Sequence, residues 1–369
     1  PMSQALLRRA AAQRALQLQQ ARTRAECFVE YALPHEKTGR RVFNAHFHEE
    51  WQQTLRDEEK VLLMAPVEHA KTQHIAVGAT LHAVGMDPTL RSAIVANSGA
   101  QAAKTLSSIR RHIETNKRVQ EVFPDLRPSP HEGDSWHSMA LTVNRPTISK
   151  DPTVQAVGVQ GSVLGSRLDL IVVDDLLDFE NTRTAAARKK TVDWFDSTVL
   201  SRLTDHGRVW VIGTPWHPDD LLHVLAQRPG WFYQRYSAVL NPRDPITDWR
   251  PLWPEQFNAN RLRGISAGMT PLNFARSYLC EARSEAAGRF QEDWINACLA
   301  LGKGLTFRQT PPTGSNGAYY PCYTGVDLAL GKNNKSDLSS MFTIAIDEAS
   351  RRIVCDIQSG RWKAPEIIS

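Results

Sequence analysis

The chain has 369 residues, and 41% of them are apolar, which is enough to bury a large core and to form two domains. No apolar run approaches the roughly 18 to 20 residues of a membrane-spanning helix, and the N-terminus lacks the apolar segment of a secretory signal. These features exclude an integral membrane protein, and we expect a soluble protein of the cytoplasm.

The net charge of +5 is concentrated near the N-terminus, because residues 1–26 contain five arginines and a single acid, Glu26. The rest of the chain is close to neutral, so overall basicity is a poor argument for nucleic-acid binding. The same residues are rich in Ala, Leu, Gln and Arg, which predicts a helical extension over 1–26. The five cysteines have no CxxC spacing, so neither zinc nor a disulfide framework is indicated, and we expect reduced, mostly buried thiols.

A phosphate-binding loop is indicated where the apolar run from Val61 ends at Pro66 and Lys71 opens a predicted helix. Backbone N–H groups of such a loop face an anion, the lysine reaches the β- and γ-phosphates, and the next hydroxyl binds Mg²⁺. The Walker A spacing G-x-x-x-x-G-K-[ST] falls on residues 65–72, with alanine in place of both glycines. The alternative is a strand end with a solvated lysine. The predicted nucleotide-binding residues are Pro66, Glu68, His69, Ala70, Lys71 and Thr72.

An acidic pair, Asp174 and Asp175, ends the apolar run RLDLIVVDD, which is typical of a strand buried on both faces of a parallel sheet. Carboxylates at the C-terminal end of such a strand lie where α/β sheets bind ligands. This Walker B pattern predicts that Asp174 holds Mg²⁺ and that Asp175 orients or deprotonates the attacking water. Asp178 and Glu180 are substitutes for the second role, and a polar turn after a strand is the alternative.

A third apolar strand, Arg208 to Gly213, ends in Thr214. A small polar residue at this place in a P-loop motor contacts the γ-phosphate and reports whether ATP or ADP is bound. The simpler reading is a turn or helix cap. Strand candidates at 61–64, 92–96, 141–144, 170–173 and 208–212 alternate with helical stretches at 72–84, 100–116 and 184–203, which predicts an α/β fold with a mainly parallel sheet.

The order of these segments resembles the large terminase subunits, the DNA-packaging motors of tailed bacteriophages. The resemblance rests on the glycine-poor loop at 65–72, the block KDPTVQAVGVQGSVLGSRLDLIVVDD at 150–175, IGTPWHPDDL at 212–221, residues 274–294 and the GVD triplet at 325–327. Each piece is short, and their shared order carries the resemblance. It implies a RecA-like (ASCE) P-loop ATPase with a small helical lid, followed by the beginning of an RNase H-like nuclease. It also implies that Phe43, His46, His48 and Gln52 line the adenine pocket.

The implied domains are an N-terminal extension (1–26), the ATPase core (27–230), a mainly helical lid (231–301), a Pro- and Gly-rich linker (302–317) and an incomplete nuclease domain (318–369). Arg167 precedes the acidic strand, and in oligomeric ATPases an arginine near this edge enters the neighbouring subunit's site. We expect Arg167 to act in this way, with Arg202 and Arg145 behind it. A surface arginine that pairs with an acid is the alternative.

Three strands are predicted after the linker, with Asp327 in the first and Asp356 in the third. By the resemblance these carboxylates hold the metals of a two-metal nuclease, Mg²⁺ or Mn²⁺, with Asp337 as a weaker candidate. A lone aspartate in a strand is otherwise more often structural. Because further acids on later elements are needed and the sequence ends at Ser369, we expect this chain to hydrolyse ATP and to cut DNA poorly or not at all.

The resemblance implies ATP and Mg²⁺ as cofactors and double-stranded DNA as substrate, translocated into the procapsid and cut from concatemers. The implied partners are the portal protein, on which copies of the chain form a ring, and the small terminase subunit, without a membrane. The implied location is the host cytoplasm and, transiently, the viral procapsid. Two alternatives stay open, a P-loop helicase or translocase that separates strands and a non-hydrolysing assembly module with a decayed phosphate loop.

Overall fold

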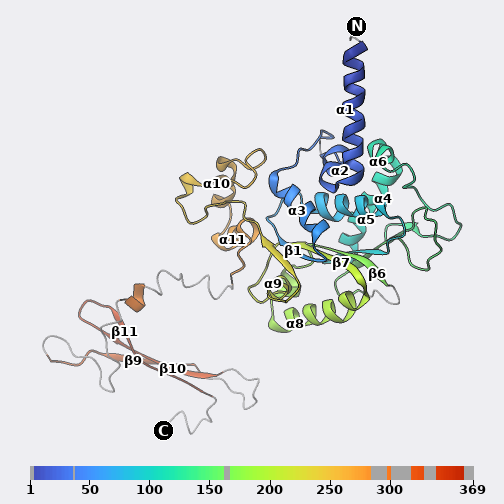
Figure 1. Ribbon diagram of the computed structural model, residues 1–369. Helices are drawn as coiled ribbons and strands as arrows, with labels where there is room; N and C mark the ends of the chain where they lie inside the picture. The colour runs from blue at the N-terminus through green and yellow to red at the C-terminus, as the bar shows by residue number, and fades with distance from the viewer. Residues whose placement is uncertain are drawn as a thin grey trace. The chain divides into compact units, whose positions relative to one another are not determined.

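The computed structural model describes residues 4–35, 38–161, 167–283, 297–300, 317–327 and 338–360 (Figure 1). The chain divides into two compact units, residues 1–289 and 290–369. Most of the predicted linker at 302–317 lies outside the described residues, and the domain boundaries stay predictions. No helix in the described part is long and apolar enough to cross a membrane.

The first unit is built on one eight-stranded sheet with the order β3-β4-β5-β2-β6-β7-β1-β8. Strands β5, β2, β6, β7, β1 and β8 are parallel to one another, while β3 and β4 form an antiparallel hairpin at one edge. One strand, β7, separates β1 from β6, as in a RecA-like ATPase sheet. The strand bounds are β1 Lys60–Met64, β2 Ser92–Ala96, β3 Trp136–His137, β4 Ala140–Leu141, β5 Val154–Gly158, β6 Leu168–Asp174, β7 Leu203–Gly213 and β8 Phe232–Arg235.

The central strands form because their side chains are apolar on both faces, and the residues of β2 and nearly all those of β1 and β6 are buried. This confirms the predicted α/β fold with a mainly parallel sheet. Strand β5 was not predicted, since VQAVG is short and contains a polar residue and a glycine. It lies beside β2 in the sheet.

Helices cover both faces of the sheet (Figure 1). One core, containing Phe28, Trp51 and Leu106, packs under α2, α3, the π-helical segment η1, α4 and α5, and the second, containing Phe195 and Leu222, packs under α8 and α9. The helix bounds in this part are α2 Ala25–Ala32, α3 His46–Asp57, η1 Thr72–Ala79, α4 Thr80–Met86, α5 Gly99–Thr115, α6 Lys117–Val122, α7 Phe179–Thr182, α8 Ala185–Trp194, η2 Phe195–Val199, η3 Leu200–Arg202 and α9 Leu221–Ala226.

The predicted helical extension is α1, Gln4–Thr23, which extends away from the sheet (Figure 1). Only its end packs on the core, where Ala21 is buried and the Arg22 Nε atom donates to the Val122 carbonyl at 2.9 Å. Arg14 forms an ion pair with Glu121 at 2.7 Å. The other described side chains of α1 are mostly exposed to solvent.

The segment after β7 was expected to be mainly helical, and the structure differs. Its regular elements are β8, η4 Ile246–Asp248, α10 Ala259–Ala267 and α11 Pro271–Leu279. Four prolines between positions 242 and 254 explain the difference, because proline ends or prevents a helix. We call residues 231–283 the lid segment.

The second unit contains an antiparallel sheet with the order β11-β10-β9, as predicted. The strands are β9 Cys322–Asp327, β10 Ser339–Ile346 and β11 Arg352–Gly360. A tight turn joins the last two, with the Ser350 N–H donating to the Asp347 carbonyl at 2.9 Å. The expectation of mostly buried thiols is wrong, because Cys280 is buried and the other four cysteines are not, Cys322 and Cys355 lying on this open sheet.

Gly78 marks the closest approach of η1 to α2. A Cβ atom there would lie 2.5 Å from the Val29 Cγ2 atom and 2.9 Å from the Gln73 carbonyl oxygen. We expect Gly78→Ala to lower the free energy of unfolding by about 1–3 kcal/mol, measured by urea denaturation. Gly264→Ala is the matched control, since a Cβ there meets nothing within 4 Å and alanine favours the helix. Equal effects of the two substitutions would contradict the packing argument.

Candidate functional site

The candidate site lies at the C-terminal edge of three neighbouring parallel strands. The loop after β1 carries Lys71 and Thr72, β6 ends at Asp174, and Thr214 follows β7. Parallel strands in register deliver these side chains to one edge, where α/β sheets bind ligands. Residues that are separated by up to 143 positions in the sequence therefore contact one another.

Lys71 is the centre of this cluster, with a side chain that is only 4% exposed. Its Nζ atom donates to the Thr214 hydroxyl at 2.7 Å and to the carbonyl oxygens of Ala65 at 3.1 Å and Pro66 at 3.3 Å. The Asp175 carboxylate is 3.4 Å away. An ammonium group has three donors, so these partners satisfy it fully, and a phosphate would have to replace some of them.

The loop backbone adopts the conformation that glycine normally supplies. Glu68 and Ala70 have φ angles of 59° and 60°, in the left-handed region, although neither is glycine. Ala70 is followed by Lys71 in the right-handed helical region, and such an alternation arranges successive N–H groups into a concave anion-binding nest. The alanine in the Walker A pattern thus keeps the backbone shape of the glycine that it replaces.

Asp174 is buried, and its Oδ2 atom accepts a hydrogen bond from the Thr72 hydroxyl at 2.8 Å. Burial, and then the negative charge of Asp175, raise the pKa of Asp174 to about 7, against the opposing effects of Thr72 and Lys71. Its Oδ1 atom is buried and has no hydrogen-bond partner among the described residues.

A magnesium ion fits this donor set. One carboxylate and one hydroxyl offer the hard oxygen ligands that Mg²⁺ prefers, with the remaining positions left for phosphate and water. The unpartnered Oδ1 atom of Asp174 would gain a ligand from such an ion. The described residues contain no group of three or more His, Cys, Asp or Glu side chains arranged for a metal ion. A site of this kind therefore depends on the nucleotide for its other ligands.

Asp175 differs from its neighbour in both exposure and backbone shape. Its side chain is 48% exposed, and its φ of 43° lies in the left-handed region. Its N–H donates to the Ile212 carbonyl at 3.0 Å, which fixes the turn after β6. The carboxylate thus reaches the open side of the cluster, where a water molecule is accessible.

Three buried histidines lie behind the phosphate loop. The His48 ring stacks on His74 with 3.9 Å between centroids and donates from Nε2 to the His69 carbonyl at 3.2 Å. Burial lowers the pKa of His48 to about 3 and that of His69 to about 4, so both are neutral at pH 7. They act as packing groups, in agreement with the expectation that the histidines near residues 46–48 do not bind metal.

The residues expected around the adenine do not form one pocket wall. Phe43 and His46 are exposed, whereas His48 and Gln52 are buried in the core. The Gln52 amide donates to the His74 carbonyl at 2.7 Å, which holds α3 against η1.

The arginine expected to act on a neighbouring subunit, Arg167, is exposed and immediately precedes β6. Seven residues of strand separate it from the acidic pair, which corresponds to about 20 Å. Arg167 is therefore too distant to contact the site of its own chain, and its action on another copy stays a prediction. Arg145 donates to the carbonyls of Ser149 and Asp151, and Arg202 lies in η3.

The two acids of the second unit are not brought together. Asp327 pairs with Ser340 and Asp356 pairs with Thr343, and both are exposed. Positions 340 and 343 point to opposite faces of their strand, so the two carboxylates do as well. Asp337 lies outside the described residues. The metal-binding roles of Asp327 and Asp356 stay predictions.

The lid contacts on the phosphate loop were not predicted. Arg261 forms an ion pair with Glu68 at 3.2 Å, and the Phe257 ring stacks on His69 with 4.6 Å between centroids. The one signal in the sequence was the spacing of four between Phe257 and Arg261, which places both on one side of a helical turn. A pairing across 193 residues cannot be read from such local spacing.

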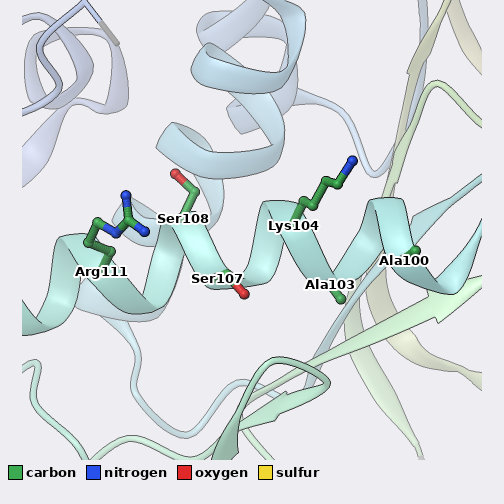
Figure 2. Close-up of a pocket in the computed structure, with 6 residues that line it drawn as sticks. All are labelled: Ala100, Ala103, Lys104, Ser107, Ser108 and Arg111. Carbon is green, nitrogen blue, oxygen red and sulfur yellow. The ribbon is translucent and has the colours of Figure 1, made fainter. Parts of the chain in front are cut away.

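A separate surface pocket of about 360 Å³ lies along α5. Figure 2 shows its lining residues, which come from one helix and include two exposed cations, Lys104 and Arg111. The small side chains Ala100, Ala103 and Ser107 leave this stretch open. The pocket contains no residue of the phosphate loop or of the acidic pair.

The raised pKa of Asp174 predicts a specific dependence of stability on pH. An aspartate in the unfolded chain loses its proton near pH 4, whereas folded Asp174 keeps it up to about pH 7. The folded state therefore binds more protons between these values, and the free energy of unfolding falls as the pH rises through this range. We expect Asp174→Asn to remove this fall in urea denaturation series at pH 4 to 8. Asp193→Asn at an exposed position is the control, and equal slopes in wild type and Asp174→Asn would contradict the assignment.

The left-handed alanine also predicts a stability change. A Cβ atom in this region costs roughly 1–2 kcal/mol, while glycine loses about 0.5–1 kcal/mol more backbone entropy on folding. We expect Ala70→Gly to raise the free energy of unfolding by about 0.5–1 kcal/mol. Ala103→Gly on α5 is the matched control and should lower it by about 1 kcal/mol. A loss of stability in Ala70→Gly would show that the loop does not hold this φ angle.

Comparison with protein-family models finds no match. Among curated proteins, the chain is similar to the terminase large subunit of Enterobacteria phage T3, with 31% identity over 184 residues that cover 47% of this chain and 29% of the T3 protein. The chain thus matches less than a third of that relative's length.

Two solved structures show weaker likeness over more of the chain. The large terminase of bacteriophage HK97 has a TM-score of 0.45 at 16% identity and covers 92% of this chain and 67% of that one. The large terminase of a thermophilic bacteriophage, solved in complex with ADP, has a TM-score of 0.41 at 10% identity and covers 88% and 70%. The similarity to the phage T3 protein confirms the family that the motifs predicted: the chain resembles the large terminase subunits of bacteriophages.

Proposed function

We propose that the first unit is the ATPase of a DNA-packaging motor, a terminase large subunit that converts ATP and water to ADP and phosphate. The observation that carries this proposal is the contact between the two predicted motifs, in which Thr72 donates to Asp174 and Lys71 lies 3.4 Å from Asp175. A loop shaped for an anion and an acidic pair at one sheet edge are the two parts that phosphoryl transfer requires.

Lys71 and the N–H groups around Ala70 bind the phosphates in this proposal. The triphosphate oxygens replace the carbonyls of Ala65 and Pro66 as acceptors of the ammonium group. Since these carbonyls belong to the loop itself, the exchange leaves the lysine buried and lets the loop relax around the ligand. The nucleotide then satisfies donors that the loop otherwise satisfies internally.

Thr72 and Asp174 hold Mg²⁺, which when bound offsets the negative charge on the β- and γ-phosphate oxygens. Coordination requires the carboxylate form of Asp174, so the hydrogen bond from Thr72 and the nearby Lys71 charge favour the competent state against burial. Asp175, on the open side, orients the attacking water and accepts its proton. Thr214 already contacts the Lys71 ammonium, so a change at the γ-phosphate reaches β7 directly.

The motor function extends this chemistry to several copies of the chain. We propose a ring on the portal protein, with Arg167 of one copy acting on the site of the next, and the small terminase subunit as a further partner. Double-stranded DNA is held mainly through its phosphates, because packaging must ignore sequence. The exposed Lys104 and Arg111 on α5 offer suitable cations. The second unit, with Asp327 and Asp356, belongs to a nuclease domain.

Lys71→Met tests the nucleotide site. We expect binding of a fluorescent ATP analogue to weaken at least about 100-fold, because the substitution removes the only buried ammonium group of the cluster while keeping the length of the side chain. Lys104→Met on α5 is the matched control and should bind the analogue normally. Far-ultraviolet circular dichroism checks that each variant is folded. Wild-type affinity in Lys71→Met would overturn the proposed function.

A further inference from the structure

Three consecutive residues of the phosphate loop each contact the lid segment. The Val67 N–H donates to the Ser277 carbonyl at 3.0 Å, the Glu68 carboxylate pairs with Arg261, and the His69 ring stacks on Phe257. The loop is therefore held along its length by elements that follow it by about 190 to 210 residues.

Arg261 is fixed from several sides. It lies on α10, its guanidinium stacks over the Phe257 ring at 4.1 Å, and one of its nitrogens donates to the Gln256 carbonyl at 2.7 Å. The Phe257 ring is in turn buried between this guanidinium and His69, which is neutral at pH 7 because burial lowers its pKa to about 4. The guanidinium thus has a defined position when it reaches Glu68 at 3.2 Å.

Glu68 is an unusual neighbour for a triphosphate. Its side chain is 62% exposed, and it lies two residues before Ala70, in a loop whose backbone is shaped to receive an anion. A free carboxylate there repels the phosphates, because like charges within about 10 Å interact at physiological salt. The Arg261 charge cancels this repulsion as long as the lid segment stays docked.

On the basis of the proposed function, we propose that Arg261 is a positioning residue through which the lid segment sets the affinity for nucleotide. With the lid docked, Arg261 neutralises Glu68 and the loop accepts the triphosphate. When the lid moves away, the ion pair opens and the uncovered Glu68 carboxylate repels the phosphates, so nucleotide is released. The lid segment thus controls product release by electrostatics, without changing Lys71 or Asp174.

The test is a double-mutant cycle on the full chain, with the dissociation constant of a fluorescent ADP analogue as the readout. We expect Arg261→Ala to weaken binding about fivefold at low salt and less at high salt. Glu68→Gln alone should bind as tightly as wild type or more tightly. Glu68→Gln combined with Arg261→Ala should restore wild-type affinity, since no carboxylate remains to be neutralised.

Two controls separate charge from packing. Arg261→Lys keeps the charge and should retain most of the affinity, while Arg263→Ala on the same helix removes a guanidinium that reaches the Thr247 carbonyl and should have no effect. Weakened binding that Glu68→Gln does not restore would mean that Arg261 acts by packing on Phe257, and unchanged binding in Arg261→Ala would mean that it has no such role. Either result overturns the inference. Absence of binding by the wild type would instead overturn the proposed function.

Discussion

The parallel register of β1, β7 and β6 is the constraint on which the rest of the structure depends. It places the phosphate loop, Thr214 and Asp174 side by side at one sheet edge, although the sequence separates them by more than a hundred residues. Lys71 then connects the three strands, because its ammonium group contacts the ends of β1 and β7 and the acidic pair after β6. If the register slipped by one residue, every one of these side chains would point to the other face of the sheet.

The site contains unfavourable conformations and charges that a nucleotide would relieve. Glu68, Ala70 and Asp175 adopt left-handed backbone conformations that cost an L-residue energy. Asp174 is buried with a carboxyl oxygen that lacks a hydrogen bond within the described chain. Such features persist because the packed sheet and the lid contacts over-determine the loop, and they are common at ligand sites. The glycines of the Walker A pattern avoid part of this cost, which is why their absence weakened the signal in the sequence.

The sequence predicted the central sheet because buried parallel strands are continuous apolar runs, which β1, β2, β6 and the end of β7 all are. It also predicted the acidic pair and Lys71 at strand ends. Local pattern could not predict β5, which contains a glutamine and a glycine, or the broken helices of the lid segment, where prolines limit length. Contacts between distant side chains, such as Arg261 with Glu68, depend on the packed fold. The opposite orientation of Asp327 and Asp356 likewise depends on strand register.

The most direct test of the account is a structure of the chain with Mg²⁺ and a slowly hydrolysed ATP analogue. The account predicts a γ-phosphate oxygen at hydrogen-bond distance from the Lys71 Nζ atom, with electron density for a metal ion between the Thr72 hydroxyl and the Asp174 carboxylate. Lys71 should then have given up its contacts with the Ala65 and Pro66 carbonyls. A nucleotide bound elsewhere, with the Lys71 contacts unchanged, would contradict the account.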